Sequence, residues 1–207
     1  MMPPTSIDGT DITGATIDGT DVTEITVDGQ TVFKSQTIIE SFEDNSLADY
    51  SGTGSLATTS PLVDNIYLES GDIYDTSASG PDSGDTFEFF VRPTADSFTG
   101  LYIKASTNSR DDSLFITVNT NQPGLSIYEY NSSGNIVQFS ENRPISISKN
   151  NIYRIETVFT GNDLTSNIFE KGSNTSLGSV TLTGQSRTGT GIGWDANSGE
   201  LDFLAIL

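Results

Sequence analysis

The segment "GLYIKASTNSRDDSLFITVNTNQPGLSIYEY", residues 100–130, contains three short apolar runs separated by residues that favour turns. In each run the aliphatic side chains occupy every second position: Leu101 and Ile103, Leu114 and Ile116, Leu125 and Ile127. A period of two residues is typical of a β-strand with one buried face. Asn, Asp, Ser, Pro and Gly between the runs favour turns. We therefore predict three consecutive strands here.

The same pattern extends over most of the chain. Besides these three strands, at 100–106, 113–119 and 124–130, we predict strands at 37–42, 66–70, 86–92, 135–139, 151–159, 164–170, 179–184, 191–194 and 200–207. So many strands without sustained helical periodicity require two packed antiparallel sheets, as in a sandwich or jelly roll.

The last predicted strand, residues 200–207, is apolar on both sides and should lie centrally in its sheet. Its alternation predicts that Leu201, Phe203 and Ala205 share one face.

The first residues repeat one pattern in ten-residue steps, marked by Asp8-Gly9, Asp18-Gly19 and Asp28-Gly29. Asp-Gly is typical of the type I′ turn of a β-hairpin. Around the third turn, Ile25, Val27 and Val32 are expected on one face. Isolated hairpins are marginally stable in water, so they need another surface. We predict that residues 1–37 form an attachment or oligomerisation arm and that residues 38–207 form the main domain.

The charge balance restricts the partners. Against 28 Asp and Glu stand 9 Lys and Arg, for a net charge of -19, which argues against nucleic acid or anionic membranes as partners. An acidic excess with few lysines favours a protein adapted to high salt, where charge repulsion is screened. The alternative is an ordinary acidic extracellular protein.

Two absences from the composition restrict the chemistry. The sequence has no Cys and no His, which excludes disulfides, thiolate or imidazole metal sites and Ser-His-Asp triads. No apolar run is long enough to span a membrane, so we expect no membrane insertion. The first residues lack a signal-peptide pattern, so we expect the protein to remain in the cell where it is made.

Two segments near the ends of the main domain carry a family resemblance. "IIESFEDNSLADYSG" (38–52) and "GTGIGWDANSGELDFLAIL" (189–207) resemble the opening and closing strands of laminin-G-like, concanavalin-like jelly rolls. The resemblance implies an all-β, two-sheet antiparallel jelly-roll sandwich, preceded here by the hairpin arm. It also implies that the first and last strands of the domain pair.

The arm carries a second resemblance. "DVTEITVDGQTVF" (21–33) resembles segments of tail and baseplate proteins of tailed viruses. Together with the acidic composition, it implies a structural protein on the virion surface of a haloarchaeal tailed virus, assembled in the host cytoplasm. Such a protein would be a tail-fibre, baseplate or capsid turret subunit that contacts other virion proteins and its own copies through residues 1–37. The alternative is a free extracellular carbohydrate-binding module of a halophile.

Catalysis is not expected, and we predict no cofactor. Glucanases of the same fold class use a Glu-x-Asp-x-x-Glu strand, because retaining hydrolysis needs two close carboxylates. Glu200 and Asp202 match the start of that pattern, but Ala205 stands at the position of the final Glu. We therefore predict a protein that is not an enzyme.

Calcium remains an alternative, because it binds hard oxygen ligands. Glu43, Asp44 and Asp202 would converge if the first and last strands pair. In so acidic a chain the competing interpretation is that these are solvated surface carboxylates. We therefore assign no metal site.

Host-surface glycan is the predicted ligand of the main domain. Tyr102, Phe115, Tyr128 and Tyr130 lie in the phase opposite to the aliphatic residues of their strands, so they are expected on one shared face. Aromatic rings on an outer sheet face are suited to stacking on the C–H groups of a sugar. Oligomer contacts or a second apolar layer explain the same rings. Trp194 is expected in the core.

Overall fold

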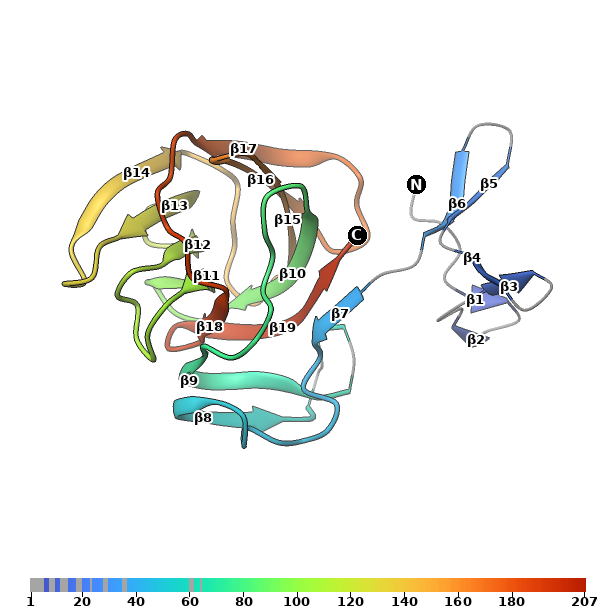
Figure 1. Ribbon diagram of the computed structural model, residues 1–207, viewed down its shortest axis with the longest axis horizontal. Helices are drawn as coiled ribbons and strands as arrows, with labels where there is room; N and C mark the ends of the chain where they lie inside the picture. The colour runs from blue at the N-terminus through green and yellow to red at the C-terminus, as the bar shows by residue number, and fades with distance from the viewer. Residues whose placement is uncertain are drawn as a thin grey trace.

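The protein is an all-β, antiparallel jelly-roll sandwich (Figure 1). The computed structural model describes residues 37–207 except 60, 61 and 64, and the backbone of six short strands between residues 6 and 34. In these parts, no helix is long and apolar enough to cross a membrane.

The six short strands form three hairpins, one around each Asp-Gly pair. The strands are β1 (Ser6–Ile7), β2 (Thr10–Asp11), β3 (Ala15–Ile17), β4 (Thr20–Val22), β5 (Glu24–Val27) and β6 (Gln30–Lys34). Each pairs antiparallel with its neighbour in sequence. The turn residues themselves, and the predicted shared face of Ile25, Val27 and Val32, lie outside the residues that the structure describes.

One sheet of 13 strands forms the main domain. Its strands are β7 (Thr37–Glu40), β8 (Ser51–Ala57), β9 (Tyr67–Asp75), β10 (Thr86–Pro93), β11 (Phe98–Ala105), β12 (Leu114–Asn119), β13 (Gly124–Tyr130), β14 (Ile136–Asn142), β15 (Tyr153–Thr160), β16 (Asp163–Glu170), β17 (Ser176–Leu182), β18 (Gly191–Asp195) and β19 (Gly199–Ile206).

The sheet bends into two layers. Hydrogen-bonded order runs β8-β9-β18-β11-β12-β13-β14 in the first layer and β7-β19-β10-β15-β16-β17 in the second. The layers join where Leu68 of β9 pairs with Leu201 of β19. As predicted, β19 lies centrally and pairs with the opening strand β7.

Away from the junction of β9 and β19, the edge strand β14 of the first layer lies beside the edge strand β17 of the second layer. Strand β14 contacts β17, as Figure 1 shows. The Gln138 side chain donates a hydrogen bond to the Thr183 carbonyl at 2.7 Å, and Asn142 donates one to the Ser179 carbonyl at 2.7 Å. Side-chain hydrogen bonds thus close a seam that no backbone ladder spans.

The core lies between the layers. The aliphatic residues of β11, β12 and β13 that alternate in sequence all point into it, and Trp194 is fully buried among them. These predictions are confirmed. Strand β8 was not predicted, because its sequence "SGTGSLA" contains little apolar alternation.

The predicted shared face of Leu201, Phe203 and Ala205 is wrong. Phe203 has a φ of 56°, and the register of β10 and β19 shifts at this residue. A bulge inserts one unpaired residue and reverses the alternation beyond it. Leu201 and Leu204 therefore enter the core, whereas Phe203 and Ala205 face outward.

Those outward residues belong to a second apolar group, the covered cluster, which consists of Leu62, Tyr67, Phe90, Phe203 and Ala205. Leu62 is fully buried and belongs to the segment before β9. Lys171 donates a hydrogen bond from its ammonium group to the Leu62 carbonyl. The outer side of the second layer is thus covered by another segment of the chain around Phe90 of β10 and Phe203 of β19.

Candidate functional site

A third apolar group, the aromatic face, lies on the outer side of the first layer and consists of Tyr74, Tyr102, Phe115, Tyr128 and Tyr130. Tyr102 pairs with Phe115, and Phe115 pairs with Tyr128, across adjacent strands. Directly opposite residues of antiparallel strands point to the same side. The rings therefore form a row perpendicular to the strands, which Phe139 of β14 continues beside Tyr128.

The rings contact one another in this row. The Tyr102 and Phe115 rings are stacked with centroids 4.2 Å apart and an interplanar angle of 16°. The Tyr128 and Phe139 rings are stacked at 6.0 Å. Such pairs contribute about 0.5–1.5 kcal/mol beyond the area they bury. The row is therefore a preorganised apolar surface.

Gly193 interrupts the row on β18, between Tyr74 and Tyr102. A Cβ at this position would lie 2.4 Å from the Cδ1 atom of Tyr74. The missing side chain allows the Tyr74 ring to approach Tyr102, with centroids 5.4 Å apart. Gly193 therefore extends the aromatic contact across a strand that carries no ring on this face.

The structure places all four predicted residues, Tyr102, Phe115, Tyr128 and Tyr130, on the aromatic face. Their exposed fractions are only 3–9%. They form a floor, and the accessible aromatic surface lies at its margin, where Phe98 is 37% and Phe139 is 59% exposed. Sequence reasoning did not identify these two rim residues. Ligand contact by the four remains a prediction.

A pocket of about 220 Å³ opens on this face. Its lining combines rings with one aliphatic side chain and two charged residues: Phe98, Tyr102, Arg110, Phe115, Tyr128, Tyr130, Ile136 and Asp195. The Arg110 guanidinium lies 5.5 Å from the centroid of the Tyr130 ring, a cation–π distance. Apolar walls with a few polar groups are typical of small-ligand sites.

The hydroxyl groups of the face remain protonated. Burial raises the pKa of Tyr74, Tyr102, Tyr128 and Tyr130 above the ordinary tyrosine range. The Tyr128 hydroxyl donates a hydrogen bond to Glu141 at 2.7 Å. These side chains therefore supply neutral rings and hydrogen-bond donors rather than phenolates.

Two carboxylates lie beside the aromatic row. Asp72 of β9 and Asp195 of β18 are directly opposite each other. Burial, and then the negative charge of Asp72, raise the pKa of Asp195 to about 6. Asn197 donates hydrogen bonds to Asp195 Oδ1 from its backbone at 3.1 Å and from its side-chain amide at 3.2 Å. Asp72 Oδ1 is buried and forms no hydrogen bond.

Sequence reasoning missed this pair. Asp72 and Tyr74 share a face because they are two residues apart on one strand, which is visible in the sequence. Their proximity to Asp195 depends on the pairing of β9 with β18, two strands that are distant in sequence. No local pattern predicts that register.

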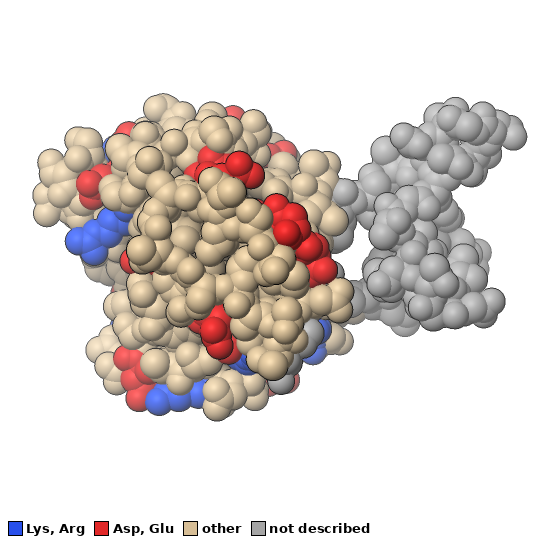
Figure 2. Space-filling model, turned by 90° about the horizontal axis from the view of Figure 1, so that it is seen from below, with Lys and Arg blue, Asp and Glu red and all other residues tan. Residues whose placement is uncertain are grey.

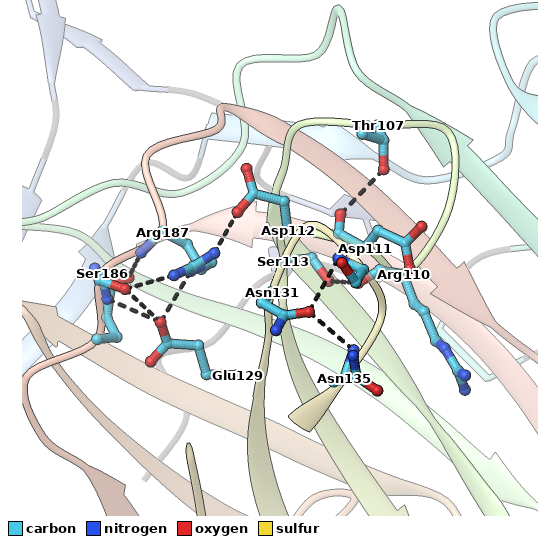
Figure 3. A network of polar contacts seen from close by, with 12 residues as sticks. Thr107, Arg110, Asp111, Asp112, Ser113, Glu129, Asn131, Asn135, Ser186 and Arg187 are labelled. Atoms are coloured by element: carbon cyan, nitrogen blue, oxygen red, sulfur yellow. Dashed lines mark hydrogen bonds and ion pairs between the residues drawn. The ribbon is translucent and has the colours of Figure 1, made fainter. Parts of the chain in front are cut away.

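A polar network holds the loops at one end of the pocket (Figure 3). Arg187 donates to the buried Glu129 carboxylate at 2.9 Å and also pairs with Asp112. The Ser113 hydroxyl donates to the Arg110 carbonyl at 2.5 Å. In Figure 3 the Arg110 side chain points away from the Glu129 and Arg187 group. The network therefore fixes the backbone of Arg110 and leaves its guanidinium over Tyr130.

The candidate calcium ligands do not converge, although β7 and β19 pair. Glu43 accepts hydrogen bonds from the backbone N–H groups of residues 65 and 66 at 2.7 and 2.8 Å. Asp44 accepts one from the Ser46 N–H at 3.0 Å, within its own turn. Asp202 is fully buried and accepts one from the Val63 N–H at 3.1 Å. In the described part of the chain, no three acidic residues gather to hold a metal.

The glucanase pattern is also incomplete in space. Glu200 is ion-paired with Arg92, and Ala205 is fully buried in the covered cluster. The position at which a second catalytic carboxylate is required thus has an apolar side chain packed against rings. A retaining hydrolase needs both carboxylates about 5–5.5 Å apart.

On the face of the domain seen in Figure 2, charged groups are spread out rather than gathered. Figure 2 shows acidic side chains dispersed over one face of the domain, with Lys and Arg near its margins. This face therefore offers no continuous basic surface for a polyanion.

Comparisons with known proteins place the fold. No family model matches the chain, and no curated protein matches it in sequence. Among solved structures, it is similar to the carbohydrate binding module CBM66 from Bacillus subtilis, with 13% identity and a TM-score of 0.51 over 75% of this chain and 91% of that one. It is similar to a legume lectin-like domain from Entamoeba histolytica, with 10% identity and a TM-score of 0.53 over 79% and 92%.

The VIP36 exoplasmic/lumenal domain in its Ca2+/Man2-bound form is also similar, with 13% identity and a TM-score of 0.53 over 83% of this chain and 86% of that one. At such identities the similarity establishes the fold, a jelly roll shared with lectin-like and carbohydrate-binding domains. The predicted relation to virion proteins rests on sequence resemblance alone.

Proposed function

We propose that the chain is a non-enzymatic carbohydrate-binding protein whose ligand lies on the aromatic face. The observation that carries the proposal is the pocket of about 220 Å³ with aromatic walls, a carboxylate and a guanidinium. Sugars present apolar C–H faces to rings and hydroxyl groups to a few polar side chains. The carbohydrate-binding neighbours of the same fold support this choice.

The ligand would enter over the rim rather than stack on the floor. Phe98 and Phe139 are the exposed rings, and each contacts Tyr128, with centroids 5.9 and 6.0 Å apart. The floor residues hold these two rings in place. Binding energy is therefore expected mainly from the rim rings and from polar groups at the pocket edge.

A glycan array followed by calorimetry tests this proposal. We expect Phe139→Ala to reduce affinity for the best glycan at least about tenfold, the loss of roughly 1.4 kcal/mol expected for one stacking ring. Ile38→Ala is the matched control, because Ile38 is similarly exposed, at 56%, on β7 in the other layer. Equal affinities of the two variants, or no binding to any glycan, would contradict the proposal.

We propose further that residues 1–37 attach the domain to an assembly, so that weak glycan contacts act together. Repeated copies raise the effective concentration of each site. The virion surface of a haloarchaeal tailed virus is the assembly that the sequence resemblance favours. Light scattering of the full chain and of residues 38–207 should give an oligomer and a monomer, respectively. Genes for capsid or baseplate proteins beside this gene would support the proposed location on a virion. A monomeric full chain would contradict the proposed attachment role of residues 1–37.

A further inference from the structure

We infer that the pocket beside Asp195 accepts a protonated amine, so that the preferred ligand of the aromatic face contains an amino sugar. This inference rests on the proposed glycan function and adds the chemical class of the ligand. It depends on the Asp72 and Asp195 pair, on its aromatic surroundings and on the position of Arg110.

The carboxylate pair lacks a cationic partner. Asp72 and Asp195 face each other across two hydrogen-bonded strands. Within the described part of the chain, every ion pair of Lys or Arg is made with other carboxylates. Asp72 Oδ1 is buried and has no hydrogen-bond donor. Two adjacent half-buried carboxylates repel each other, and either a proton or a cation relieves that repulsion.

The surroundings favour an organic cation. Asp72 and Tyr74 face Asp195 from β9, and Tyr102 faces it from β11. Tyr130 on β13 is close enough for the charge of Asp195 to raise its pKa. These tyrosines keep their protons, so each supplies a neutral ring whose face attracts positive charge. An ammonium group entering the pocket would therefore meet the Asp195 carboxylate and aromatic rings together, with the charge of Asp72 behind Asp195.

The charge of Arg110 restricts where in the pocket an amine can bind. Its guanidinium lies over the Tyr130 ring, and it lines the same pocket as Asp195. An amine beside Arg110 would be repelled by like charge, whereas one beside Asp195 would be attracted. The pocket lining thus contains one cationic and one anionic side chain, and the anionic Asp195 selects the amine.

The pH dependence of binding follows from the same pair. Protonation of Asp195 removes one of the two negative charges, so affinity for the amine falls as the pH is lowered through about 6. At high pH the ligand amine loses its own proton, near about 8 by analogy with an α-amino group. Binding of the amine is therefore expected to be strongest between these limits.

The experiment is calorimetry on the full chain with three β-1,4-linked tetramers, of glucosamine, N-acetylglucosamine and glucose, at pH 7 and pH 5. We expect the glucosamine tetramer to bind at least about tenfold more tightly than the other two at pH 7, which corresponds to about 1.4 kcal/mol. At pH 5 this preference should largely disappear.

Asp195→Asn should abolish the preference for the glucosamine tetramer over the N-acetylglucosamine and glucose tetramers at pH 7. Asp72→Asn should do the same in a second variant, in case Asp195→Asn does not fold. Glu170→Gln is the matched control, because it removes one exposed carboxylate from β16 in the other layer and should retain the preference.

The outcomes separate this inference from the proposed function. Binding of the tetramers without preference would overturn the amine site and keep the glycan function, whereas no binding to any glycan would overturn both. Calcium is the competing occupant. If calcium alone stabilises the protein through Asp195 and abolishes the preference for glucosamine, the pair is a metal site and the inference is wrong.

Discussion

The two layers differ in how far the apolar side chains on their outer faces are covered. The covered cluster of the second layer has Leu62 packed on its rings, and Lys171 holds that segment by its carbonyl. Among the residues that the structure describes, the aromatic face of the first layer is closed mainly by its own rings, and its rim residues Phe98 and Phe139 remain exposed. One apolar face is thus covered by another segment of the chain, whereas the other has a pocket that opens outward.

The largest expected effect is on the covered side. Leu62→Ala should reduce the free energy of unfolding by about 2–4 kcal/mol, because it removes a fully buried side chain and leaves a cavity over the cluster. Urea unfolding measures this loss. Phe139→Ala, on the exposed rim, should change stability by less than about 1 kcal/mol. Similar losses in both variants would show that the two faces do not differ in this way.

An intermediate effect is expected where the aromatic row crosses β18. Gly193→Ala should destabilise the protein by about 1–3 kcal/mol, because the new methyl group overlaps the Tyr74 ring. Removing that ring should relieve the overlap, so Gly193→Ala should cost less in a Tyr74→Ala background. A double-mutant cycle in urea measures the coupling. Additive losses would mean that the ring does not require the glycine.

The third prediction concerns the carboxylates of Asp72 and Asp195. Here the substitution is expected to raise the stability of the protein rather than lower it. Because the pKa of Asp195 is raised to about 6 in the folded protein, folding loses stability as the pH rises from about 4 to about 6. Asp195→Asn should therefore stabilise the protein at pH 7.5 by roughly 1–2 kcal/mol, allowing for partial solvent screening, and should have little effect at pH 4.

Urea midpoints at the two pH values measure this difference. A gain in stability together with a loss of amine affinity is what a ligand site is expected to show, since such sites often hold groups that oppose folding. A destabilised Asp195→Asn variant at pH 7.5 would mean that the carboxylate is a structural hydrogen-bond acceptor instead.

How much of the site was predictable depended on the distance in sequence between its parts. Tyr102, Phe115 and Tyr128 were predictable as neighbours, because they lie on three consecutive hairpin-connected strands with clear alternation. Asp195 and Gly193 were not, because β18 inserts beside β11 from far along the chain. Pairing between distant strands depends on the whole sheet, which no local pattern encodes.

The fold was predictable where the strands are regular and not where their pairing is interrupted. Alternation predicted the layers and the central closing strand, but it failed at Phe203, where a bulge reverses the faces. For Glu43 and Asp44 the sequence left a calcium site and solvated surface groups as alternatives, and their carboxylates bond to backbone N–H groups instead of converging with Asp202. In both places hydrogen bonding with the backbone decided where the side chains point.

The seam between β14 and β17 limits how copies of this protein can join. Gln138 and Asn142 occupy carbonyl groups of the facing edge with their amides. A neighbouring molecule that tried to add its own strand there would first have to displace these amides. The seam thus opposes strand addition at the β14 and β17 edges, so the edges at which a neighbouring strand could still pair are those of β7 and β8.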